Sequence, residues 1–133
     1  MKQENKELLL KDLCARLPYG VKVSKVVENW TSDPHPIRSI NLNNIIVEDG
    51  EFEDGTPDID IWDYEDIKPY LFPLSSMTEE QKREYHELTD GFFGASVLIT
   101  FEDLTDFFNK NHIDYRCLIP MDLANDATNL NIY

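Results

Sequence analysis

The first residues of the chain show the spacing of an amphipathic helix over residues 5–17. Apolar side chains recur there at intervals of three and four residues, which place them on one helical face. This face contains Leu10, Leu13, Cys14 and Leu17. Pro18 cannot continue the helix because it lacks a backbone N–H group, and Gly20 lets the chain turn. The pattern therefore predicts an N-terminal helix with one buried stripe.

Four later segments have the composition or the apolar–polar alternation of half-buried strands. They are residues 20–27, 38–42, 44–48 and 58–64. In the last segment Ile59 and Ile61 face one way, whereas Asp58, Asp60 and Trp62 face the other. The prolines of residues 33–36 predict a loop, and Asn43-Asn44 predicts a tight hairpin. Short turns between such strands predict a small antiparallel, twisted sheet or partial barrel of about four strands.

A proline-bracketed aromatic segment follows the last of these strands. Pro69 and Pro73 hold this segment extended, as a joint between the sheet and the next helix. Thr78 is a natural N-cap, and Gln81 stands where its side chain completes a capping box. The helix is expected to stop at Gly91.

The chain after this helix predicts one more helix, over residues 102–112, with either Asn111 or His112 as its cap. Residues 96–100 fit either a short strand or a first helical turn. Together the patterns predict an α+β fold with an N-terminal helix, the small sheet and two further helices. The length fits one domain, residues 1–133.

The charge of the chain narrows the classes of partner. It has 26 acidic and 12 basic residues, a net charge of −14, and its carboxylates are concentrated between Glu48 and Asp66. Such a surface repels nucleic-acid phosphates and anionic membranes, and it favours a basic protein surface as partner. The candidate acidic face consists of Glu48, Asp49, Glu51, Glu53, Asp54, Asp58 and Asp60. We expect these residues to be exposed, and the oligomeric state stays open.

No residue pattern indicates a metal or a cofactor. The acidic segment lacks the glycine and ligand spacing of a calcium-binding loop, and no pair of histidines has zinc-ligand spacing. Glycine-rich phosphate loops are also missing from the sequence. No export signal or membrane-spanning stretch is visible, so we expect a cytoplasmic protein.

A weak enzymatic candidate remains in the last third of the chain. His112, Tyr115 and Arg116 form a polar cluster near a predicted turn. Cys117 could pair with His112 as a nucleophile, but the acidic surroundings do not favour a thiolate. Cys14 and Cys117 fit free thiols in a reducing compartment.

Three segments carry a resemblance to a known family. They are KDLCARLPYGVKV (11–23), DIKPYLFPLSSMTEEQ (66–81) and NKNHIDYRCLIPMDLA (109–124). The chain resembles a family of uncharacterised small proteins from gut bacteria of the Bacteroides group and from their phages and prophages. The family pattern has glycine where this chain has Cys117 and Asp122. The resemblance implies a phage or mobile-element origin and no particular activity.

These observations leave three functional hypotheses. The first is a non-enzymatic, phage-associated interaction module whose acidic face meets a basic protein. The second is a small hydrolase or nucleotide-handling enzyme, which needs a concave site with converging titratable groups. The third is a structural or assembly accessory protein, which would expose a large apolar patch.

Overall fold

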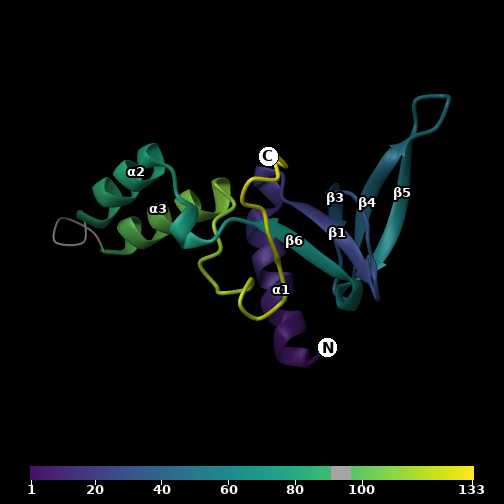
Figure 1. Ribbon diagram of the computed structural model, residues 1–133, viewed down its shortest axis with the longest axis horizontal. Coiled ribbons are helices and arrows are strands. Elements are labelled where there is room, and N and C mark those ends of the chain that lie inside the picture. Colours follow the sequence, from purple (N-terminus) through teal and green to yellow (C-terminus); the bar gives the residue numbers. More distant parts are fainter. Residues whose placement is uncertain (91–96) are drawn as a thin grey trace.

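Helix α1 (Gln3–Arg16) runs along one side of a β-sheet in the computed structural model of the chain, which describes residues 1–90 and 97–133 (Figure 1). The predicted helix is confirmed, but its buried face is not the predicted one. Its fully buried residues are Leu9, Asp12, Leu13 and Arg16, whereas Cys14 is exposed. The face is rotated because Asp12 and Arg16 neutralise each other inside the protein, which an apolar stripe cannot indicate.

The sheet is open and contains seven strands among the described residues. They are β1 (Lys22–Val27), β2 (Trp30–Thr31), β3 (His35–Ile40), β4 (Asn44–Glu51), β5 (Pro57–Asp63), β6 (Ile67–Leu71) and β7 (Asn125–Asp126). Their order is β5-β4-β3-β1-β6-β7, with β2 paired to β1. All neighbours are antiparallel except β6 and β7, which are parallel. The predicted α+β class is confirmed. The predicted strand number of about four is wrong, the sheet is not a partial barrel, and the β6–β7 pair makes it mixed rather than antiparallel.

Strand β6 is the main element that the alternation missed. Ile67, Pro69, Tyr70 and Leu71 are all buried, so the segment has no apolar–polar period. A strand buried on both faces has a continuous apolar sequence, and Pro69 reinforced its interpretation as a joint. In the structure Pro69 lies opposite Val23 of β1, inside the sheet.

The predicted loop over residues 33–36 is also partly wrong, because β3 begins at His35 and includes Pro36. Only two residue pairs join β1 to β3, so a missing proline N–H group removes little of the pairing. The predicted hairpin near Asn43-Asn44 is confirmed between β3 and β4.

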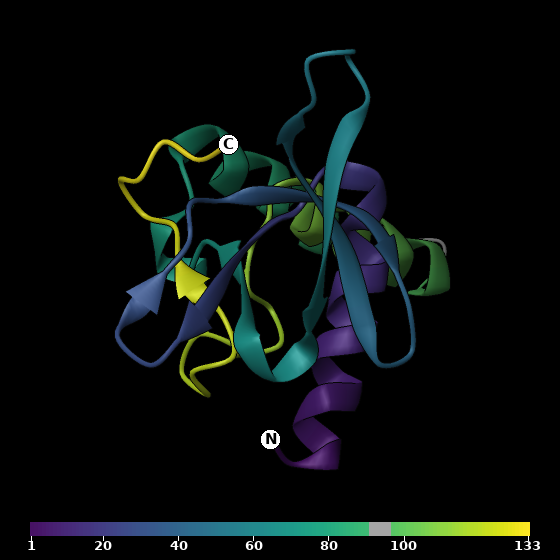
Figure 2. The ribbon, with the colours of Figure 1, turned by 90° about the vertical axis from the view of Figure 1, so that its right-hand side faces the viewer.

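Strands β4 and β5 form a long hairpin that projects from the body of the molecule (Figures 1 and 2). The predicted alternation of β5 is confirmed, since Trp62 is buried while Ile59 and Ile61 are exposed. The buried face is thus the one that carries the tryptophan and two aspartates. Ile59 and Ile61 lie on the outer face of this edge strand.

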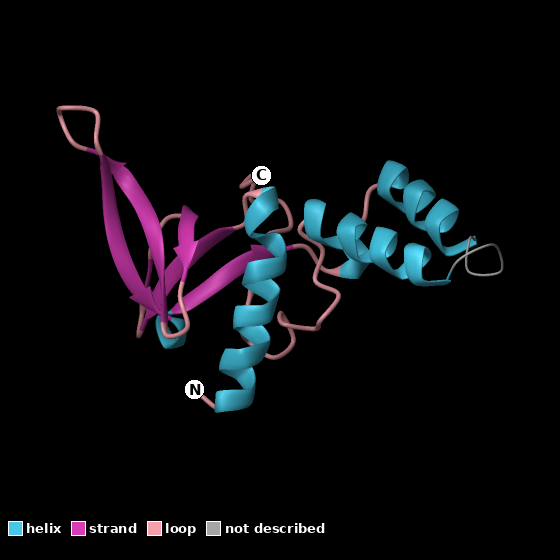
Figure 3. Cartoon of the chain, turned by 180° about the vertical axis from the view of Figure 1, so that it is seen from behind, coloured by secondary structure: helices cyan, strands magenta, loops and turns pink. Residues whose placement is uncertain are grey.

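Helices α2 (Glu79–Asp90) and α3 (Val97–Lys110) lie at the other end of the molecule from the β4–β5 hairpin (Figures 1 and 3).

The predicted capping box of α2 is confirmed. The Gln81 backbone N–H donates to Thr78 Oγ1 at 3.1 Å, and the Thr78 N–H donates to Gln81 Oε1 at 2.9 Å. The predicted stop at Gly91 lies outside the described residues. Of the ambiguous segment, residues 97–100 are helical.

Three short 3-10 helices complete the regular structure of the described residues. They are η1 (Leu17–Tyr19), η2 (Tyr64–Asp66) and η3 (Leu74–Ser76). Tyr64 of η2 is buried and donates a hydrogen bond to the carbonyl of Asn41, which fixes the β3–β4 turn against the sheet. Burial raises the pKa of Tyr64 to about 12, so its hydroxyl keeps its proton.

The hydrophobic interior consists of two clusters, and Arg16 connects them. The first cluster fills the space between α1 and the sheet, and the second contains Phe107, Phe108 and Ile113 near the end of α3. Arg16 Nη1 and Nη2 donate to the carbonyls of Phe108 and Ile113 at 3.4 and 2.7 Å. Arg16 Nε donates to Asp12 Oδ2 at 2.9 Å. The guanidinium therefore binds α1 to the chain that leaves α3.

We expect Arg16→Met to lower the free energy of unfolding by about 3–5 kcal/mol, because it leaves the buried Asp12 carboxylate without its main partner. Arg38→Met is the matched control, since Arg38 is exposed and lies 3.9 Å from Glu48. The control should lose less than about 1 kcal/mol. Urea unfolding of both variants is the measurement, and equal losses would contradict the central role of Arg16.

Candidate functional site

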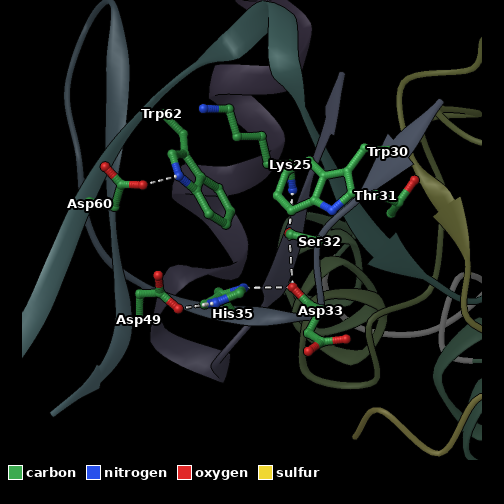
Figure 4. Close-up of a pocket in the computed structure, with 9 residues that line it drawn as sticks. All are labelled: Lys25, Trp30, Thr31, Ser32, Asp33, His35, Asp49, Asp60 and Trp62. Carbon is green, nitrogen blue, oxygen red and sulfur yellow. Dashed lines mark hydrogen bonds and ion pairs between the residues drawn. The ribbon is translucent and has the colours of Figure 1, made fainter. Parts of the chain in front are cut away.

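A cleft of about 380 Å³ opens where the β4–β5 hairpin faces strands β1, β2 and β3 (Figure 4). We call it the Trp30–Trp62 cleft. Its lining residues are Lys25, Trp30, Thr31, Ser32, Asp33, His35, Asp49, Asp60 and Trp62. They come from five strands and the turn after β2, so only the assembled sheet brings them together.

The two tryptophans of the chain lie on opposite sides of this cleft (Figure 4). Trp62 belongs to the core and is 3% exposed, and its indole N–H donates to Asp60 Oδ2 at 2.8 Å. Trp30 is 57% exposed. A large, exposed indole beside a concavity is typical of a binding surface, since aromatic rings supply much contact area with little loss of conformational entropy.

His35 lies between the tryptophans, and both of its ring nitrogens face acceptors. Nδ1 lies 2.6 Å from the carbonyl oxygen of Asp33, and Nε2 lies 2.8 Å from Asp49 Oδ1. The ring packs edge-on against Trp62, with centroids 5.1 Å apart. A carbonyl and a carboxylate only accept hydrogen bonds, so acceptors hold the ring from both sides. Both ring nitrogens are thus already engaged within the protein.

Asp60 stays ionised in the cleft. The hydrogen bond from the Trp62 indole lowers its pKa, and the Ile61 N–H and the charges of Lys25 and His35 act in the same direction.

The Ser32 hydroxyl, in contrast, is held by hydrogen bonds to the backbone. Its hydroxyl accepts from the Lys25 N–H at 2.8 Å and donates to the Asp33 carbonyl at 3.0 Å. Within the described part of the chain, the partners of this hydroxyl are backbone groups, which do not activate it as a nucleophile.

The seven residues of the predicted acidic face are distributed over the β4–β5 hairpin. Six of them are exposed as expected, and Asp58 is half-buried. Asp49 and Asp60 line the cleft, whereas Glu48 lies opposite Ile59 in the sheet and 3.9 Å from Arg38. Glu51, Glu53 and Asp54 are at the hairpin tip. The structure therefore brings two of the seven together in a concave site and places three at the end of a projection.

Of His112, Tyr115 and Arg116, the last two contact each other, with the Arg116 guanidinium 4.7 Å from the centroid of the Tyr115 ring. His112 stacks on Tyr133, with ring centroids 3.6 Å apart. Tyr115 stacks on Phe108, and Arg116 Nη1 donates to Asp12 Oδ1 at 3.3 Å. These contacts serve the packing of the chain after α3, and they do not aim the three groups at one reacting atom.

His112 is buried, and burial lowers its pKa to about 4 from an ordinary value of 6.5. The charges of Arg16 and Lys22 act in the same direction. Its Nδ1 has no hydrogen-bond partner within the described part of the chain, which fits a neutral ring. The Tyr133 hydroxyl beside it donates to the Tyr70 carbonyl and accepts from the Lys22 N–H. Burial raises the pKa of Tyr133, so this hydroxyl stays protonated.

Comparison with known proteins found no matching family model, no similar curated protein and no similar solved structure. The described residues contain no group of three or more histidine, cysteine or acidic side chains that could hold a metal ion. None of the helices in the described ranges combines the length and the apolar character needed to cross a bilayer.

Sequence reasoning missed most of the cleft. Of its nine residues only Asp49 and Asp60 were among the candidates. Trp30 gave a usable signal, because an aromatic residue between Asn29 and Thr31 in a polar segment is not placed there by a buried strand. The remaining lining residues carry no motif, and only the strand order brings them together.

The resemblance predicts glycine at positions 117 and 122, and the backbone of this chain is left-handed at both positions. Cys117 has φ 61° and Asp122 has φ 59°. Glycine adopts this conformation without strain, whereas a side chain with Cβ does not. The backbone thus gives a physical reason for glycine at both positions and no reason for a thiol at 117.

We expect Cys117→Gly to raise the free energy of unfolding by about 0.5–1 kcal/mol, because relief of the left-handed strain exceeds the added entropy of the unfolded chain. Cys117→Ala removes the thiol but keeps Cβ, so it should be neutral. Urea unfolding compares the two variants. A Cys117→Gly variant no more stable than Cys117→Ala would contradict the explanation.

The lowered pKa of His112 predicts a loss of stability in acid. A folded-state pKa below the unfolded value means that its contribution is present above pH 6.5 and is lost as the pH falls towards 4. Between pH 7.5 and 4.5 the loss from this group is about 2–3 kcal/mol. His112→Asn should remove that part of the pH dependence, because asparagine does not titrate and tolerates the left-handed φ of 57°.

Urea unfolding at both pH values measures this difference. His86→Asn is the control, since His86 is exposed on α2 and should leave the pH dependence unchanged. Parallel pH profiles of His112→Asn and the original protein would show that His112 is not held neutral by the fold.

Proposed function

We propose that this chain is a non-enzymatic protein-interaction module that binds a basic segment of another protein through the β4–β5 hairpin and the cleft at its base. The observation that carries the proposal is the Trp30–Trp62 cleft, in which carboxylates and exposed aromatic surface converge, while other groups of the protein already engage the His35 ring nitrogens and the Ser32 hydroxyl. Such a site binds a ligand but does not transform it.

The charge distribution supports a basic partner. The hairpin tip carries three exposed carboxylates, and the ion pairs on the hairpin are those of Asp49 with His35 and of Glu48 with Arg38 among the described residues. Its projection from the body lets a partner approach from several sides (Figure 2). Long-range attraction from a net charge of −14 would accelerate association with a cation-rich surface.

The resemblance to phage and prophage proteins supports an association with mobile elements as a second part of the proposal. An interaction module needs no cofactor and acts by occupying a surface, so the absence of a motif for chemistry in the sequence is compatible with it.

A ten-residue oligolysine peptide should bind the protein, and the affinity should fall as sodium chloride increases. Neutralising the hairpin tip with Glu51→Gln, Glu53→Gln and Asp54→Asn should weaken binding about tenfold, since each exposed ion pair contributes a few-fold. Isothermal titration calorimetry at two salt concentrations is the measurement.

The control makes the same change of charge on α3, with Glu102→Gln, Asp103→Asn and Asp106→Asn, three exposed residues far from the hairpin. This control should bind nearly as well as the original protein. The proposal is wrong if oligolysine does not bind, or if both triple variants lose the same affinity through net charge alone.

A further inference from the structure

We infer that the Trp30–Trp62 cleft receives one cationic side chain, a lysine or an arginine, from the basic segment that binds the hairpin. The inference rests on the proposed function and identifies the chemistry of its central contact. It concerns a defined pocket, whereas the proposed function needs only attraction between charged surfaces.

The aromatic walls of the cleft favour a cation. Indole is the aromatic side chain that attracts ammonium and guanidinium groups most strongly, because the face of its π-system is negative. Trp62 is fixed by the core and by its bond to Asp60, so it offers a rigid wall. Trp30 leaves more than half of its surface exposed on the other side, where an inserted side chain would cover it.

The carboxylates of the cleft can hold the charged group. Asp49 and Asp60 each make contacts inside the cleft, but a carboxylate has about four acceptor positions and is not saturated by one or two donors. Together with Asp33 they bring three negative charges, against the one positive charge of Lys25. The cleft is thus net negative and lies at the base of an acidic hairpin.

Lys25 already places a positively charged side chain in the cleft. It lines the cleft, and its charge is among the causes that lower the pKa of Asp60. A partner side chain would share this carboxylate with Lys25 or replace it. Removing the charge of Lys25 should therefore strengthen binding of the basic peptide. If the cleft had only a structural role, this substitution would not strengthen peptide binding.

The experiment uses tryptophan fluorescence, because both tryptophans of the chain line the cleft and the signal comes from this site alone. The probes are ten-residue peptides that alternate serine with arginine or with lysine. Matched neutral peptides carry citrulline or acetyl-lysine instead. We expect saturable fluorescence changes with both cationic peptides and at least tenfold weaker binding of both neutral ones.

Three variants locate the contact. Trp30→Ala, at an exposed position, should weaken binding of the arginine peptide about fivefold to tenfold, and Asp49→Asn should weaken it several-fold. Lys25→Met should tighten it several-fold. Urea unfolding establishes that each variant is folded, and calorimetry reports total binding independently of the cleft signal.

The outcomes separate the two proposals. Loss of all peptide binding in calorimetry would overturn the proposed function together with this inference. Binding in calorimetry that is unchanged in Trp30→Ala would overturn only the inference and leave the hairpin as the binding surface. Equal binding of citrulline and arginine peptides, with an equal fluorescence change, would show that the cleft takes apolar or neutral surface and not a cation.

Discussion

The buried Asp12–Arg16 pair is the interaction on which the arrangement of the molecule depends. Both side chains are completely buried, and such a pair is tolerable only when further hydrogen bonds satisfy the charges. Arg16 meets this requirement through the carbonyls of Phe108 and Ile113, and Asp12 through Arg116. Because these partners come from a part of the chain almost 100 residues away, neutralising one buried charge also fixes how the helical end of the molecule meets the sheet.

The proposed binding surface lies at the other end of the molecule from the two helices α2 and α3 (Figure 1). Helix α1 covers the inner part of the sheet, and strands β4 and β5 extend beyond it as a hairpin (Figures 1 and 3). Trp62 anchors the base of that hairpin in the core, while Asp60 and Asp49 on the same strands face the cleft. The binding surface thus combines a rigid floor with an exposed, charged projection. A rigid floor reduces the entropy lost on binding, and the projection provides attraction at longer range.

The candidate site was partly predictable. The excess of carboxylates over residues 48–66 indicated the hairpin as a charged surface, because net charge along the chain is independent of fold. The cleft was not predictable, because Lys25, His35 and Trp62 are brought together by the order β5-β4-β3-β1 and not by any motif. The three residues His112, Tyr115 and Arg116, which are close in sequence, are only partly together in space. Arg116 packs over the Tyr115 ring, whereas His112 stacks on Tyr133.

The sequence by itself determined the helices, the capping box at Thr78 and Gln81, the alternation of β5 and the sign of the surface charge. These features depend on neighbouring residues or on composition, so their physical causes are complete within a short segment. Tertiary structure alone decided that Asp12 and Arg16 face inward in place of Cys14, that Pro69 lies within a buried strand, and that Trp30 and Trp62 share one cleft. In each case the conformation is decided by contacts with residues that are distant in sequence. These contacts pair a buried charge, fill the core or form the walls of the cleft. Local pattern contains no information about such a contact.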